Sequence, residues 1–119
     1  MSMEEFIDYY ENHHSKLGIP MMPLARRYVR RYVKPEPNPI TGEVVELPFD
    51  VVMELWWNSR EDYETTMKSL GEGENFKLIY EDEERIFASH DNPVFTVEEC
   101  DSELPNGVAG TVKGLEDSL

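Results

Sequence analysis

Two adjacent histidines, His13 and His14, follow a pair of tyrosines near the start of the chain, and these residue types together can move protons. An imidazole has an ordinary pKa of ~6.5, so His14 can act as a general acid or base without a cofactor. Tyr10 lies one helical turn earlier on the same face, and its hydroxyl can hold an oxyanion or orient the imidazole. The pattern predicts proton transfer next to a carbonyl group, with His14 and Tyr10 as catalytic residues.

The same residues also have a purely structural interpretation, which stays open. His14 near the end of a helix is favoured there by the helix dipole, and Tyr10 fits the core equally well. Adjacent residues on an ideal helix point about 100° apart, so we expect His13 at the surface or at a subunit contact. A helical metal site usually has histidines four residues apart, and the sequence has no such pair. We predict no metal and no cofactor.

Capping and periodicity place these residues on a helix. Ser2 and Glu5 form a capping box, and apolar residues then repeat with helical spacing. Gly18 and Pro20 suit the end of that segment. We therefore expect a helix over residues 3–17.

Two strands are predicted to follow the helix. Residues 26–34 alternate tyrosine or valine with arginine, and residues 49–57 are rich in valine, leucine and tryptophan. One face of the first strand is expected to bind substrate, through an aromatic wall and a carboxylate clamp. The residues on that face are Tyr28, Arg30 and Tyr32.

The second strand adds further candidates for ligand binding. Glu54 and Trp56 share one of its faces, and a buried Glu54 needs a partner, which Arg30 would supply if the two strands pair in register. Such a pair is more often structural than substrate-binding, and Trp56 is most simply explained as a core or dimer-interface residue. His90 lies in a turn, and loops at strand ends often line sites, so it joins the predicted ligand-binding residues.

The remaining segments complete the predicted order. Ser59 begins a second helix, residues 74–87 read as a third, and residues 93–99 as a last strand. This order is an α+β, ferredoxin-like βαββαβ unit without its first strand. We expect one domain over residues 1–103 and a mobile polar tail over residues 104–119.

Composition narrows the range of partners. The chain has 119 residues, a hydrophobic fraction of 39% and a net charge of −14, which fits one small globular domain. Nucleic acids and anionic membranes require a basic surface, and no apolar run is long enough to span a bilayer. The acidic start is unlike a signal peptide, and Cys100 is the single cysteine. We therefore expect a cytoplasmic protein without nucleic-acid or membrane partners.

In this order, the segments resemble the EthD family of the dimeric α/β-barrel superfamily. The first helix is similar to the family's first helix, with His14 and Leu17 at the places of its histidine and leucine. The stretch "ARRYVRRYV" resembles the second strand, and "PFDVVMELWWNSREDYE" resembles the third strand and following helix, with Glu54 before an aromatic pair. The stretch "PVFTVEE" resembles the last strand, so the resemblance runs from Ser2 to Glu99.

The resemblance implies a homodimer whose two sheets form a barrel, with a ligand cavity between each sheet and its helices. Relatives include cofactor-free enzymes of aromatic compound metabolism and accessory proteins of degradation pathways. Two hypotheses follow. The chain is a cofactor-independent, lyase- or isomerase-like catalyst on an aromatic, polyketide-like or keto-acid compound, with His14 as general acid/base. Alternatively, it is a non-catalytic ligand-binding or accessory protein of a degradation or biosynthesis pathway.

One departure from the family pattern affects the expected sheet. Family members begin with a strand, whereas this chain opens directly on the helix cap. We therefore expect either a truncated first strand or a substitute strand from residues 107–115, which hold three glycines.

Overall fold

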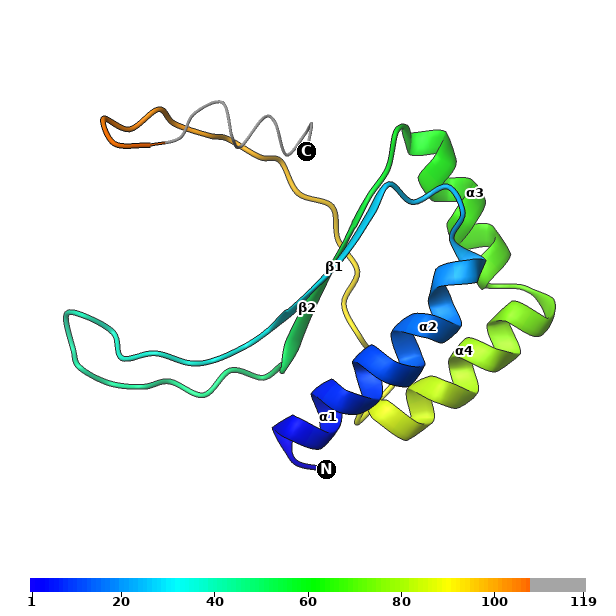
Figure 1. Cartoon of the computed structure of the whole chain (residues 1–119), viewed down its shortest axis with the longest axis horizontal. Helices are drawn as coiled ribbons and strands as arrows, with labels where there is room; N and C mark the ends of the chain where they lie inside the picture. The colour runs from blue at the N-terminus through cyan, green and yellow to red at the C-terminus, as the bar shows by residue number, and fades with distance from the viewer. Residues whose placement is uncertain (108–119) are drawn as a thin grey trace.

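The computed structural model describes residues 1–107, which form a two-stranded antiparallel sheet with helices on one of its faces (Figure 1). The helical segments and strands in chain order are α1 (Met3–Tyr9), η1 (Tyr10–His14), α2 (Ser15–Gly18), η2 (Ile19–Met21), β1 (Arg27–Tyr32), β2 (Val51–Trp56), α3 (Arg60–Leu70) and α4 (Gly73–Ile86). This arrangement is α+β and compatible with the predicted ferredoxin-like fold.

The predicted first helix is confirmed, with one internal change of winding. The Ser2 side chain accepts from the Glu5 backbone N–H at 3.1 Å, and the Glu5 carboxylate accepts from the Ser2 N–H at 2.7 Å, which completes the capping box. Within the helix, η1 is a π-helical turn between the α-helical segments α1 and α2. Single π turns inside α-helices occur often at functional sites.

The strands β1 and β2 pair as predicted, and their register fixes which side chains face the helices. Tyr28 lies opposite Leu55, and Tyr32 lies opposite Val51. Because facing residues of an antiparallel pair share a side of the sheet, these residues lie on one face together. Tyr28, Tyr32 and Val51 pack against a buried cluster of Phe6, Tyr10 and Ile86.

The second and third predicted helices are also confirmed. Ser59 caps α3, where its side chain accepts from the Asp62 backbone N–H at 3.1 Å. Gly73 has a φ of 57°, a value that glycine adopts without steric cost, and it starts α4 directly after the end of α3. The inward side of α4 buries Asp82 and Ile86 next to η1. Among residues 1–107, no helix is long and apolar enough to cross a bilayer.

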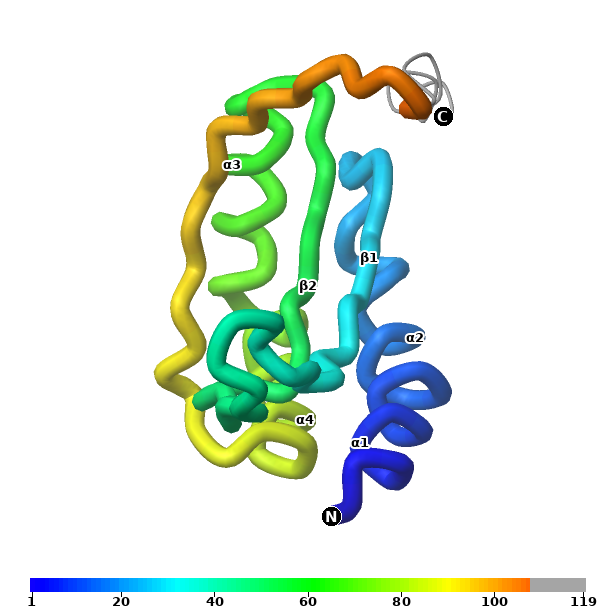
Figure 2. The backbone as a smooth tube through the Cα atoms, turned by 90° about the vertical axis from the view of Figure 1, so that its left-hand side faces the viewer, coloured from blue at the N-terminus to red at the C-terminus, as the bar shows by residue number. Residues whose placement is uncertain are grey.

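The predicted last strand, residues 93–99, is wrong for this structure. The segment carries no strand and no backbone hydrogen bond to β1 or β2. Figure 2 shows it leaving α4 and running separately from the two strands. Val94, Phe95 and Val97 are 77%, 70% and 75% exposed. A strand requires hydrogen bonds to a partner edge, and this segment makes none to the outer edge of β1 or β2.

Because residues 93–99 form no strand, the sheet of the described residues has two strands instead of the expected three. As expected, the described residues contain no strand before α1. Most of the predicted tail and of the possible substitute strand falls in residues 108–119, which lie outside the described residues. Their predicted roles stay predictions.

Candidate functional site

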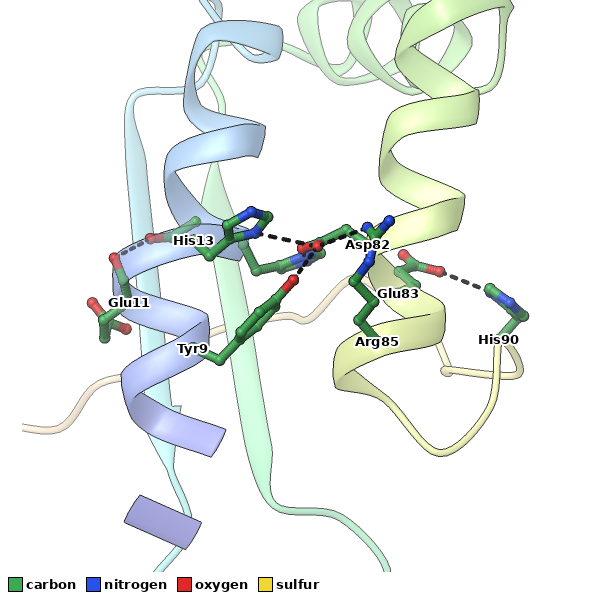
Figure 3. A network of polar contacts seen from close by, with 9 residues as sticks. Tyr9, Glu11, His13, Asp82, Glu83, Arg85 and His90 are labelled. Carbon is green, nitrogen blue, oxygen red and sulfur yellow. Dashed lines mark hydrogen bonds and ion pairs between the residues drawn. The ribbon is translucent and has the colours of Figure 1, made fainter. Parts of the chain in front are cut away.

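The best-defined polar cluster in the described chain is built around one buried carboxylate, Asp82 of α4. Its side chain is 0% exposed. The Tyr9 hydroxyl donates to one carboxylate oxygen at 2.5 Å, and Nδ1 of His14 lies 2.7 Å from the other oxygen. Figure 3 shows Tyr9 and His13 of the first helix pointing toward Asp82 of α4, while Glu11 points away from it. The predicted base His14 therefore has a fixed acidic partner.

His13 also reaches Asp82, which ideal helical spacing did not indicate. Its Nδ1 lies 3.2 Å from the carboxylate oxygen that Tyr9 contacts, and its ring stacks on the Tyr9 ring with centroids 4.8 Å apart. The side chain is 55% exposed, so the prediction of a surface position is confirmed. Arg85 approaches the same oxygen from within α4, at 3.4 Å.

The π turn η1 is the backbone element that holds both histidines. It spans Tyr10–His14, and its carbonyl at Glu11 accepts from the Ser15 hydroxyl at 3.0 Å. Because a π turn is wider than an α turn, its residues are spaced differently around the axis. Both imidazoles are thus brought to one carboxylate, although they are neighbours in sequence.

Electrostatics favour an ionised Asp82. Burial alone raises the pKa of a carboxyl group, but hydrogen bonds from Tyr9 and His14, together with the charges of the two histidines, outweigh it and lower the pKa of Asp82. An ionised carboxylate only accepts hydrogen bonds, so Nδ1 of His14 carries its proton toward Asp82. In the neutral ring, the other nitrogen, Nε2, then carries no proton and can accept a hydrogen bond.

The aromatic surroundings of His14 come from the helix and from the residue after α4. Its ring packs edge-on against Tyr10 at 5.0 Å and against Phe87 at 5.4 Å between centroids. The His14 side chain is 10% exposed, and Tyr10 is 2% exposed. Burial raises the pKa of Tyr10 far above its ordinary range, so its phenol stays protonated at neutral pH. The two predicted catalytic residues therefore lie together in the core.

A second polar cluster joins the π turn to β1. Nε of Arg30 donates to a carboxylate oxygen of Glu11 at 3.0 Å, and its Nη2 donates to the other oxygen. The Tyr32 hydroxyl also donates to Glu11. The hydrogen bond from Arg30 is the largest cause of a lowered pKa of Glu11. The Arg30 guanidinium lies over the Tyr28 ring, 4.5 Å from its centroid.

The predicted Arg30–Glu54 pair is wrong, because the two side chains lie on opposite faces of the sheet. Arg30 stands opposite Met53, while Glu54 stands opposite Val29. Glu54 instead accepts from Nε1 of Trp56 at 2.9 Å.

The other predicted ligand-binding residues are divided in space. Tyr28, Arg30 and Tyr32 share the helix-covered face, as the strand pattern predicted. Trp56 lies on the opposite face, where the guanidinium of Arg27 stacks over its ring at 5.1 Å.

His90 does not join the Asp82 cluster. Its ring stacks on Tyr80 with centroids 3.9 Å apart, and its Nδ1 lies 3.3 Å from Glu83 (Figure 3). The contacts of His90 are thus with Tyr80 and Glu83, and its predicted ligand-binding role stays a prediction.

A shallow hollow lies at the start of β1, away from both histidines. Its lining residues are Ile19, Met22, Ala25, Arg26, Arg27 and Tyr28. It shares only Tyr28 with the predicted site. Among residues 1–107, no group of three or more histidine, cysteine or acidic side chains is arranged to hold a metal ion.

Sequence reasoning missed Asp82 and Glu11, although one of them had a readable signal. Asp82 stands three residues after Ile79 and four before Ile86, which places a charged residue on the apolar stripe of a helix. A charge in that position needs a buried partner. Glu11 had no comparable signal, since many exposed helical residues are acidic.

Comparison with known proteins adds one positive finding. The family model described as "EthD domain" matches residues 1–90, which is most of the chain. No curated protein and no solved structure matched it. The match covers the first helix and α4, which build the Asp82 cluster, and the sheet between them in sequence. The chain therefore belongs to the EthD-domain family.

Proposed function

We propose that this EthD-domain protein catalyses cofactor-independent proton transfer on a small carbonyl compound, with His14 as the general acid/base. The observation that supports this best is the hydrogen bond between Nδ1 of His14 and the buried Asp82. A carboxylate that holds Nδ1 fixes the tautomer and the orientation of the ring, and it stabilises the imidazolium formed when Nε2 accepts a proton.

The surrounding residues suit a substrate that develops negative charge. Tyr10 packs on the His14 ring, and its protonated phenol is a donor for an oxyanion. Tyr28 and Tyr32 supply aromatic surface on the same side of the sheet. The guanidinium of Arg30 already donates to both carboxylate oxygens of Glu11. We therefore assign Arg30 a structural role beside these tyrosines and not the binding of a substrate carboxylate.

This chemistry points to a lyase- or isomerase-like reaction, and to an aromatic, polyketide-like or keto-acid compound as substrate. General acid–base catalysis by one positioned side chain contributes roughly 10²- to 10⁴-fold to a rate. For a reaction that consists only of the removal and return of a proton, one such general acid/base can supply a rate acceleration of this size.

The test combines binding and turnover for wild type, His14→Gln and His90→Gln. His90 is the matched control, because it also lies beside a carboxylate of α4 but outside the Asp82 cluster. Thermal-shift screening with aromatic acids, aldehydes and β-keto acids finds the chemical class that stabilises the wild type. We expect turnover of that class to fall at least about 100-fold in His14→Gln and to stay unchanged in His90→Gln.

The same experiment distinguishes the second candidate, a non-catalytic ligand-binding or accessory protein. The low exposure of His14 and the position of the hollow away from it favour this candidate. Ligand-induced stabilisation without turnover, unchanged in His14→Gln, would support it and would remove the catalytic proposal.

We further propose that the protein acts as a homodimer in which two sheets face each other as a barrel. The helices cover one face of the sheet, while the long β1–β2 connection extends away from them on the other side (Figure 1). The uncovered face includes Val52, which is 37% exposed, beside Trp56. A cytoplasmic location stays part of the proposal and rests on the single cysteine, Cys100.

A further inference from the structure

One buried carboxylate serves two histidines that differ sharply in exposure. His14 contacts one oxygen of Asp82 at 2.7 Å, and His13 contacts the other oxygen at 3.2 Å. The side chain of His14 is 10% exposed, whereas that of His13 is 55% exposed. The pair therefore has an inner member in the core and an outer member in contact with solvent.

Sharing a single carboxylate couples the titration of the two rings. One negative charge fully compensates one imidazolium, so protonation of one ring makes protonation of the other less favourable. The outer ring exchanges protons directly with solvent. Within residues 1–107, the charged group in contact with the inner ring is Asp82.

Two other side chains, Tyr9 and Arg85, also contact Asp82, but neither changes its charge near neutral pH. Tyr9 donates to Asp82 as a neutral phenol, because burial and the nearby carboxylate raise its pKa. Arg85 adds a permanent positive charge at 3.4 Å from the same carboxylate.

The charged side chains on the neighbouring elements pair with partners other than His14. On the β1 side, the charges of Glu11 and Arg30 pair with each other. On α4, Glu83 lies beside His90. The tyrosine that contacts His14 is Tyr10, whose phenol stays neutral at physiological pH. The second imidazole on the carboxylate that holds His14 is therefore the one of His13.

We propose that His13 is a tuning residue, which sets the proton affinity of His14 through their shared carboxylate, Asp82. When His13 is protonated, it competes for Asp82 and disfavours the imidazolium form of His14. The solvent-facing ring thus keeps the core ring in its neutral, proton-accepting form to lower pH. The consequence for catalysis rests on the proposed function, but the coupling itself does not.

The test follows the titration of His14 by NMR of the imidazole carbons in wild type, His13→Gln and His13→Ala. Glutamine keeps a donor for Asp82 but has no charge, whereas alanine removes both the charge and the donor. We expect the titration midpoint of His14 to rise in both variants, by about half a pH unit or more, as for a partly solvated charge removed a few ångströms away. The acidic limb of any pH–rate profile should move in the same direction.

The matched control is His90→Gln, which removes a titrating ring outside the Asp82 cluster and should leave the His14 midpoint unchanged. An unchanged or lowered midpoint in both folded His13 variants would overturn the proposal. A rise in His13→Ala alone would also overturn it, because the effect would then come from the lost donor. Since the titration needs no substrate, it can succeed even if His14→Gln shows the proposed reaction to be absent.

Discussion

At the scale of single residues, Asp82 is the group on which the cluster depends. It accepts hydrogen bonds on both oxygens, from Tyr9 and His14, and its side chain is fully buried. A buried charge is tolerated only with such partners, because losing one leaves a desolvated polar group. Both stability and the orientation of His14 should therefore respond to a change at this position.

We predict that Asp82→Asn lowers the free energy of unfolding by about 1–3 kcal/mol. The amide places an NH₂ group where either Tyr9 or His14 now donates, so a buried donor loses its acceptor. Chemical denaturation at neutral pH measures the difference. An Asp82→Asn variant as stable as wild type would show that the cluster contributes nothing to folding.

The pH dependence of this difference has a definite sign. Because the folded-state pKa of Asp82 lies below its usual 3.8, its stabilisation is present above that value and is lost as the pH falls through the lower folded-state value. The difference between wild type and Asp82→Asn should therefore shrink as the pH is lowered below about 4.

Residue types alone predicted part of this site. An imidazole side chain has an ordinary pKa near neutrality, and a tyrosine lies one helical turn away. These two facts singled out His14 and Tyr10, whose rings are in contact in the structure. The partner Asp82 lies far away in sequence, so no local spacing links it to His14. The predicted Arg30–Glu54 pair failed because strand alternation gives the faces of each strand but not the register between them.

At the scale of elements, the π turn η1 connects the two polar clusters. From this turn, Glu11 reaches Arg30 and Tyr32 of β1, while His13 and His14 reach Asp82 of α4. The turn is therefore held from two sides. Helix periodicity and capping predicted the whole segment as helical, but they carry no signal for hydrogen bonds that shift by one residue within it.

We predict that Glu11→Gln destabilises the fold by about 1 kcal/mol, because Arg30 keeps its charge but loses its two-pronged, charged acceptor. The matched control is Glu64→Gln, which breaks an exposed pair with Arg60 one turn away on α3. Such exposed pairs are worth roughly 0.3–0.5 kcal/mol or less.

Urea denaturation of Glu11→Gln and Glu64→Gln compares the two pairs directly. Equal effects would mean that the contact between Glu11 and β1 does no more than a surface ion pair. A larger effect of Glu11→Gln would identify that contact as the one that secures the π turn.

At the scale of the whole molecule, the helices within residues 1–107 cover one face of the sheet. Helices pack on the side of Tyr28 and Tyr32, while Val29, Val52 and Trp56 lie on the other side. The sequence predicted the helices and both strands, because capping boxes and alternation are local signals. It did not predict that residues 93–99 stand apart, because strand composition does not show whether a segment docks on an edge formed by residues far away in sequence.

We predict that Val52→Glu reduces the apparent mass in sedimentation from dimer to monomer. A carboxylate at this position stands opposite Arg31 within the same sheet, so the monomer tolerates it. In the proposed dimer the same carboxylate would be buried against the apolar face of the partner's sheet, which is unfavourable. The control is Met53→Glu, which stands opposite Arg30 on the helix-covered side. A wild-type chain that sediments as a monomer at all concentrations would contradict the proposed homodimer.

The contacts of Asp82 also determine when the site can exist during folding. Tyr9 and His14 lie 73 and 68 positions away from Asp82 in sequence, so each contact closes a long loop. Closing such loops costs entropy that only later packing repays, which makes long-range contacts slow to form. The helices can wind early from their own caps, yet the paired histidines meet their carboxylate only when both ends of the domain have docked. The proposed proton-transfer site, unlike helix content, therefore belongs to the completely folded chain.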